Sequence, residues 1–133
     1  MKKIVVVTAV LALGLTACAQ NQPRTEIKRD PHAPNVHVVA GKYIVVDQEP
    51  IVIEKGDSDD RIIWQLPLNT TYTFPADGIV IKDGGVVFKC NVEANGKRFV
   101  CKNNKTPGMY KYTIKVMDGA KTLQPLDPFV LND

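Results

Sequence analysis

The three cysteines of this 133-residue chain are the residues with the most chemistry open to them, because a thiol can be acylated, oxidised or bound to a metal. Cys18 follows a Lys2-Lys3 pair, an apolar run from Ile4 to Leu15 and two small residues. A charged start, a short apolar stretch and a small-residue cleavage site are typical of a secretory signal. The apolar run is too short to span a bilayer as a mature helix. We therefore expect residues 1–17 to be removed on export.

The tetrapeptide Leu15-Thr16-Ala17-Cys18 resembles the lipobox of bacterial lipoproteins. The resemblance implies that Cys18 becomes the lipidated first residue of the mature protein and that acyl chains on Cys18 hold it to a membrane. Ala19 is not Asp, which under the enterobacterial sorting rule implies the outer membrane. We expect the domain to face the periplasm, with exposure at the cell surface left open.

Removal of the signal leaves 116 residues, enough for one domain. The formal charge of +3 falls to +1, because Lys2 and Lys3 leave with the signal and no acid does. This balance excludes a general nucleic-acid binder.

Cys90 and Cys101 form a pair once Cys18 is assigned to lipidation, and a disulfide is the usual state of such a pair in an exported protein. Asn95-Gly96 between them is a strong hairpin signal, because a type I′ turn needs positive φ at both central residues. Counting outward from that turn sets Glu93 against Arg98, Val92 against Phe99 and Cys90 against Cys101. The alternative, a redox-active pair, lacks a Cys-x-x-Cys spacing.

Catalytic and metal-binding constellations are sparse. The two histidines, His32 and His37, fall in a polar, proline-containing segment that we interpret as a tether, so we expect no His-based catalysis, no enzyme activity, no metal site and no cofactor. Asp57, Asp59 and Asp60 crowd one turn, which is either a polar turn between strands or a weak calcium site that lacks the EF-hand pattern.

Basic residues cluster late in the chain, with Glu93 as the single acid among them. They are either solvated side chains on strand faces or one basic face for an anionic lipid, polysaccharide or wall polymer. The residues are Lys89, Lys97, Arg98, Lys102, Lys105, Lys111 and Lys115.

Short β-branched and aromatic runs separated by Gly, Pro, Asn and Asp predict an all-β fold, a small antiparallel sandwich. The clearest strand is Met109–Met117, where Tyr110, Tyr112, Ile114 and Val116 share one face. We expect a signal peptide over 1–17, lipidated Cys18 with a flexible tether over 18–37, and a sandwich over 38–133. The other predicted strands are Lys42–Val46, Pro50–Glu54, Arg61–Leu66, Thr70–Phe74, Gly78–Lys82, Val86–Val92, Lys97–Lys102 and Pro128–Leu131.

Trp64 in an early strand and Gly108-Met109-Tyr110 at a late corner resemble the immunoglobulin-like sandwich over residues 38–133. Tyr112 stands where that family has its second framework cysteine. The loop from Thr106 to Tyr110 also resembles the cupredoxin ligand loop, but no histidine lies between Cys101 and Met109, so the resemblance implies that shape without copper.

These observations favour a non-catalytic envelope lipoprotein that binds or assists a protein partner. The segment Leu126–Asp133 is predicted to be a last strand, whose backbone could add a partner's strand if it lies at a sheet edge. The alternative function is recognition of an anionic ligand by the basic residues between 89 and 115.

Replacing Cys18 by Ser removes the atom that carries the acyl chains. We expect C18S to move from the membrane fraction to the soluble envelope fraction on cell fractionation. Unchanged detergent partitioning of the variant would overturn the anchor.

Overall fold

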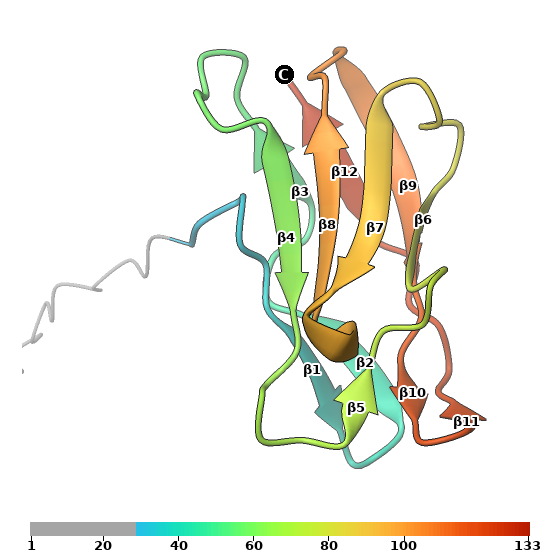
Figure 1. Cartoon of the computed structure of the whole chain (residues 1–133). Coiled ribbons are helices and arrows are strands. Elements are labelled where there is room, and N and C mark those ends of the chain that lie inside the picture. Colours follow the sequence, from blue (N-terminus) through green and yellow to red (C-terminus); the bar gives the residue numbers. More distant parts are fainter. Residues whose placement is uncertain (1–28) are drawn as a thin grey trace, which may run out of the picture.

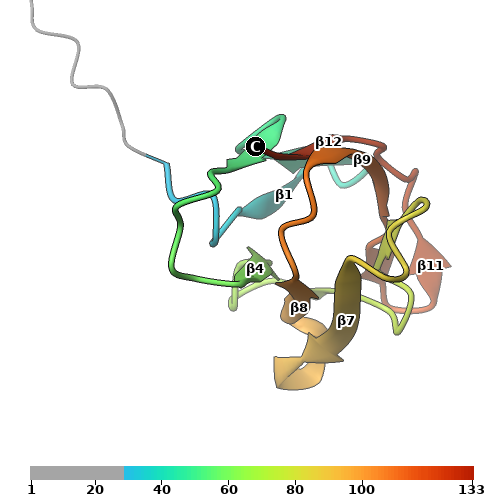
Figure 2. The same ribbon diagram turned by 90° about the horizontal axis from the view of Figure 1, so that it is seen from above.

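Strands make up nearly all regular structure in the computed structural model, which describes residues 29–133. Two sheets pack face to face (Figures 1 and 2), which confirms the predicted all-β sandwich. One sheet has the order β3-β12-β9-β6, formed by Ile51–Ile53, Phe129–Asn132, Gly108–Ile114 and Ile79–Ile81. The other has the order β4-β8-β7, formed by Arg61–Gln65, Arg98–Asn103 and Phe88–Glu93. The predicted signal peptide, Cys18 and the start of the predicted tether lie outside the described residues.

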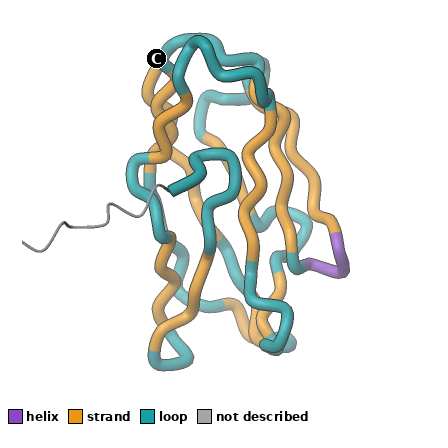
Figure 3. Tube along the Cα trace, turned by 90° about the vertical axis from the view of Figure 1, so that its left-hand side faces the viewer, coloured by secondary structure: helices purple, strands orange, loops and turns teal. Residues whose placement is uncertain are grey.

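Smaller elements gather at one end of the sandwich, below the main sheets in Figure 1. A hairpin joins β1 (Val36–Val39) to β2 (Tyr43–Val46), and a second small sheet has the order β11-β10-β5. Its strands are Lys121–Thr122, Met117–Asp118 and Tyr72–Thr73. The single helical element of the described residues is the 3₁₀ turn η1 (Ala94–Gly96), which projects beyond the strands in Figure 3. Between residues 29 and 133 we find no helix with the length and apolarity to cross a bilayer.

The seven strands of the two main sheets follow the order of an immunoglobulin sandwich. Named A to G along the chain, they form a B-E-D sheet and an A-G-F-C sheet. The first strand, β3, lies on the second sheet, where it pairs in parallel with β12, and every other pairing is antiparallel. The order thus favours the immunoglobulin resemblance over the cupredoxin one. Trp64 lies on β4, the second strand of this order, whereas antibody domains carry their tryptophan on the third.

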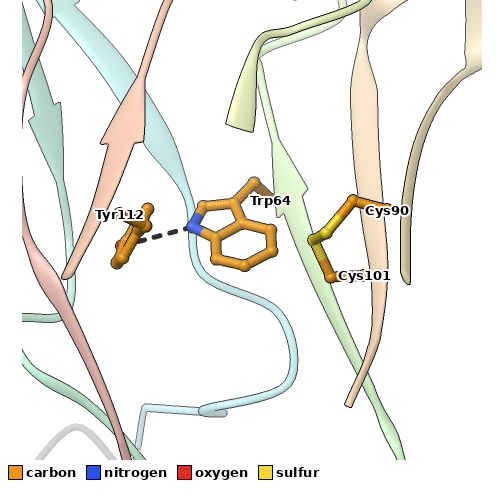
Figure 4. Close-up of a disulfide and its surroundings, with 4 residues drawn as sticks. All are labelled: Trp64, Cys90, Cys101 and Tyr112. Carbon is orange, nitrogen blue, oxygen red and sulfur yellow. Dashed lines mark hydrogen bonds between the residues drawn. A yellow bond between two sulfur atoms is a disulfide. The ribbon is translucent and has the colours of Figure 1, made fainter. Parts of the chain in front are cut away.

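Trp64 joins the two sheets. Its ring is fully buried and its Nε1 donates a hydrogen bond to the hydroxyl of Tyr112 on β9, 3.3 Å away. β4 and β9 hold the places of strands B and F, which antibody domains join by a disulfide. Here an aromatic contact, with ring centroids 5.3 Å apart, takes that position. Figure 4 shows Trp64 between Tyr112 and the Cys90–Cys101 disulfide.

The predicted hairpin register is confirmed. β7 pairs with β8 so that Glu93 faces Arg98, Val92 faces Phe99 and Cys90 faces Cys101, and the two sulfurs are bonded. The turn itself is longer than the predicted two-residue type I′ turn: Ala94, Asn95 and Gly96 all have positive φ, and the last ladder pair is Glu93 with Arg98. Ala94 and Lys97 lie outside the ladder because Lys97 adopts a helical φ and ψ.

The strand predicted over Met109–Met117 is observed as β9, which ends at Ile114, and the predicted inward face is confirmed. Tyr112, Ile114 and Val116 are fully buried, and burial raises the pKa of Tyr112 far above its ordinary value. Tyr110 is half-buried and its hydroxyl donates to the carbonyl of Thr106 at 3.0 Å, as in the tyrosine corner of immunoglobulin domains.

The start of the sandwich and the place of its last strand differ from what the sequence suggested, and several strand ends shift by one to three residues. The sandwich boundary predicted at Val38 falls inside β1, and Asn35 already pairs with Gln65 on β4. The polar, proline-containing composition of this segment predicts a tether. Proline lacks an N–H, but here the segment is extended beside β4 and mainly accepts hydrogen bonds through its carbonyls, so proline is tolerated. The C-terminal strand is not at an edge, because β12 lies between β3 and β9.

Replacing Tyr112 by Phe leaves the buried Nε1 of Trp64 without its acceptor. We expect Y112F to lower the free energy of unfolding by about 1–3 kcal/mol. Urea unfolding followed by the fluorescence of Trp64, the single tryptophan of the chain, measures the change. Y110F is the matched control, because its hydroxyl bonds a carbonyl near the surface. An equal loss in both variants would contradict a special role for the buried contact.

Candidate functional site

His32 belongs to the folded part rather than to a solvated tether. Its side chain is 13% exposed. Nδ1 lies 2.7 Å from the carbonyl oxygen of Arg61, and Nε2 lies 3.0 Å from a carboxylate oxygen of Asp57. The second contact is an ion pair, since Nε2 has no well-directed hydrogen bond in the described chain. Both ring nitrogens are therefore engaged, which leaves neither free to act as a general base.

The electrostatics of His32 favour its charged form. Burial by itself would lower its pKa, but the carbonyl of Arg61 and the carboxylate of Asp57 outweigh burial and raise the pKa above 6.5. The ring also borders a polar hollow of about 580 Å³, lined by Arg29, Asp30, Pro31, His32, Glu54 and Asp57. The imidazole thus ties the start of the domain to the loop between β3 and β4.

The three aspartates of that loop contact different cations. Asp57 faces His32, Asp59 lies 3.5 Å from Arg61, and Asp60 lies 3.3 Å from Lys102. The described residues hold no cluster of three His, Cys, Asp or Glu side chains arranged to bind a metal. This arrangement favours the polar-turn interpretation of the loop.

The seven basic residues do not share one face. Lys89, Arg98 and Lys102 point outward from the β7–β8 hairpin, whereas Lys111 points outward from β9 in the other sheet and Lys115 follows the end of that strand. The single basic face considered from the sequence is thus divided between two sides of the sandwich.

Acids at the surface neutralise several of these cations. Arg98 lies 2.8 Å from Glu93, Lys111 lies 3.6 Å from Asp127, and Lys115 lies 2.5 Å from Asp77. Hydrogen bonds from Arg98 and Lys115 lower the pKa values of Glu93 and Asp77, while the hydroxyl of Thr113 lowers that of Asp127.

Lys97 and Lys105 bind the backbone instead of facing a ligand. Nζ of Lys97 donates to the carbonyls of Thr70 and Tyr72, each at 2.6 Å, and Nζ of Lys105 donates to the carbonyl of Asp57. Both hold loops in place. Of the seven, Lys89 is the one without an ion pair or hydrogen bond from its ammonium within residues 29–133.

The longest unpaired edge belongs to β7. It pairs with β8 on one side and with no described strand on the other. Counting from a two-residue turn predicts that Cys90 and Cys101 form a hydrogen-bonded pair, the kind of antiparallel pair whose Cα atoms lie farther apart. The Cα atoms of Cys90 and Cys101 are instead 4.0 Å apart, which is close to the spacing of an antiparallel pair that exchanges no backbone hydrogen bonds. The N–H and C=O groups of Cys90 and, two residues on, Val92 therefore point away from β8. No other described segment bonds them.

An apolar groove lies beside this edge, between β7 and β6. It has a volume of about 310 Å³, and Ile79, Ile81, Phe88, Cys90 and Phe99 contribute to its lining. Cys90 is exposed while Cys101 is fully buried, so the disulfide connects the groove to the core. A strand added to β7 would place alternate side chains over this groove.

No protein-family model matches this sequence, and a comparison with curated proteins finds no match either. The candidate site therefore depends on geometry: an open strand edge, exposed backbone groups and an apolar groove.

The ion pair of His32 makes stability depend on pH. Because the pKa is raised in the folded state, the stabilisation is fully present below the unfolded value of 6.5 and is lost as pH rises through the folded value. We expect the wild type to lose up to about 1 kcal/mol between pH of about 5.5 and about 8. Urea unfolding of H32Q should lack this loss, and H37Q, at an exposed position, should keep it. A parallel dependence in H32Q would refute the role of His32.

Proposed function

We propose that this protein is a non-catalytic binding module of the bacterial envelope, held to the membrane through Cys18, that receives a strand of a protein partner at the free edge of β7. The observation that carries the proposal is the outward direction of the backbone groups of Cys90 and Val92 beside the groove between β6 and β7. Backbone hydrogen bonds would supply affinity, and the groove would select side chains.

The placement of residues 32–35 supports the same use. Residues 32–35 run beside β4, where Ile63 and Gln65 donate to the carbonyls of His32 and Pro34. β4 and β7 are opposite edges of the three-stranded sheet. Residues 32–35 thus occupy the β4 edge, whereas β7 lies at the other edge of this sheet (Figure 1).

Rigidity of β7 supports it as well. The disulfide to β8 fixes the middle of the strand, and the ring of Phe88 packs edge-on against Tyr110 with centroids 5.1 Å apart. A preformed edge binds a partner strand with less loss of conformational entropy than a mobile one does.

A proline at position 92 tests this edge, because it removes an N–H that makes no bond within the described fold and adds a ring where a strand would pair. We expect V92P to lose the adducts that the wild type gives on formaldehyde cross-linking in intact cells, and V92A to keep them. Thermal unfolding of both variants checks that they fold. Adducts that persist in a folded V92P would overturn the proposal.

A further inference from the structure

The charges on β7 are self-complementary about Asn91. Lys89, Asn91 and Glu93 share the outward face of the strand, where they face Lys102, Val100 and Arg98 of β8. If two copies of β7 lie antiparallel with Asn91 facing Asn91, Lys89 of each copy faces Glu93 of the other. We propose that the strand received by β7 is β7 of a second copy of this chain, which forms a two-fold symmetric dimer with one continuous sheet. This inference rests on the proposed function.

The unpaired charge of the edge favours this partner. Lys89 lies directly across from Lys102, and Lys102 lies across from Arg61, so three cations form one row over the three strands. Like charges directly opposite each other are unfavourable. Glu93 of the second copy would extend that row with an acid beside Lys89, which forms no ion pair within residues 29–133.

The backbone allows the same register. Asn91 lies one residue from Cys90, so its N–H and C=O point toward β8, and an Asn91–Asn91 pair needs no backbone bonds between copies. Cys90 of one copy then faces Val92 of the other, and these residues have the outward N–H and C=O groups. Parallel pairing in register would instead set Lys89 against Lys89 and Glu93 against Glu93.

Closed symmetry limits the assembly to two copies. Both copies contribute β7 to the contact, so the free edge of each β7 is paired in the dimer. A third copy therefore finds no open β7 edge to pair with. The dimer also covers the exposed Cys90 and the groove beside it.

Charge reversal tests the dimer with the full-length chain. Two differently tagged copies are co-expressed, cross-linked with formaldehyde in intact cells, and the share of one tag retained with the other is measured. We expect K89E paired with K89E, and E93K paired with E93K, to reduce that share about tenfold, since both symmetric contacts become repulsive. K89E paired with E93K should restore it, because each acid then faces a lysine again. K121E, a reversal on exposed β11, is the matched control and should have no effect.

The outcomes separate this inference from the proposed function. A wild-type chain that does not retain its other tag, or retention that is indifferent to K89E and E93K, overturns the dimer. If the wild type instead gives adducts with a different protein that V92P removes, the edge is a binding site and its partner is not a second copy. If neither V92P nor K89E nor E93K changes the cross-linked adducts, both the binding site at β7 and the dimer are refuted.

Discussion

The contact of Trp64 with Tyr112 is the constraint on which the rest of this structure depends. It connects the second and sixth strands of the sandwich, and therefore the two sheets, through one hydrogen bond and two large buried rings. The Cys90–Cys101 disulfide lies on the far side of Trp64 (Figure 4). The indole of Trp64 thus lies between the disulfide of its own sheet and the ring of Tyr112 in the other sheet. Immunoglobulin domains use a covalent link between the sheets at the place that the aromatic pair holds here.

That packing leaves the three-stranded sheet with two unequal edges. Residues 32–35 cover β4, and the ion pair of His32 with Asp57 fixes their approach. Within residues 29–133, no segment covers β7 in this way. An exposed edge carries a risk of unspecific pairing, and proteins commonly limit that risk with charges on the strand. Lys89 and Glu93 are charges of this kind, and in the proposed dimer they would also select a partner strand of matching charge.

The sequence predicted those features that depend on neighbours close in the chain. Asn95-Gly96 fixed the β7–β8 register because the turn and its flanking pairs lie within twelve residues. The alternation in β9 predicted its buried face. β1 was missed, although Ala40-Gly41 after a β-branched run is a turn signal and both residues have positive φ. The ion pairs that divide the basic residues join Lys102 to Asp60 and Lys115 to Asp77, and no local pattern shows such distant partners.

The Cys90–Cys101 disulfide matters more for the edge strand β7 than for the joining of the two sheets. A link between adjacent strands adds little to the closure of the sandwich, because β7 and β8 are already joined by a short turn. It does prevent the outer strand from separating from β8 when a partner competes for backbone hydrogen bonds. Cys90 is fixed to β8 by the disulfide, and its N–H and C=O point to the open side of β7, where a second strand would bond them. The disulfide therefore favours the addition of a partner strand to β7 over the replacement of β7 by that strand.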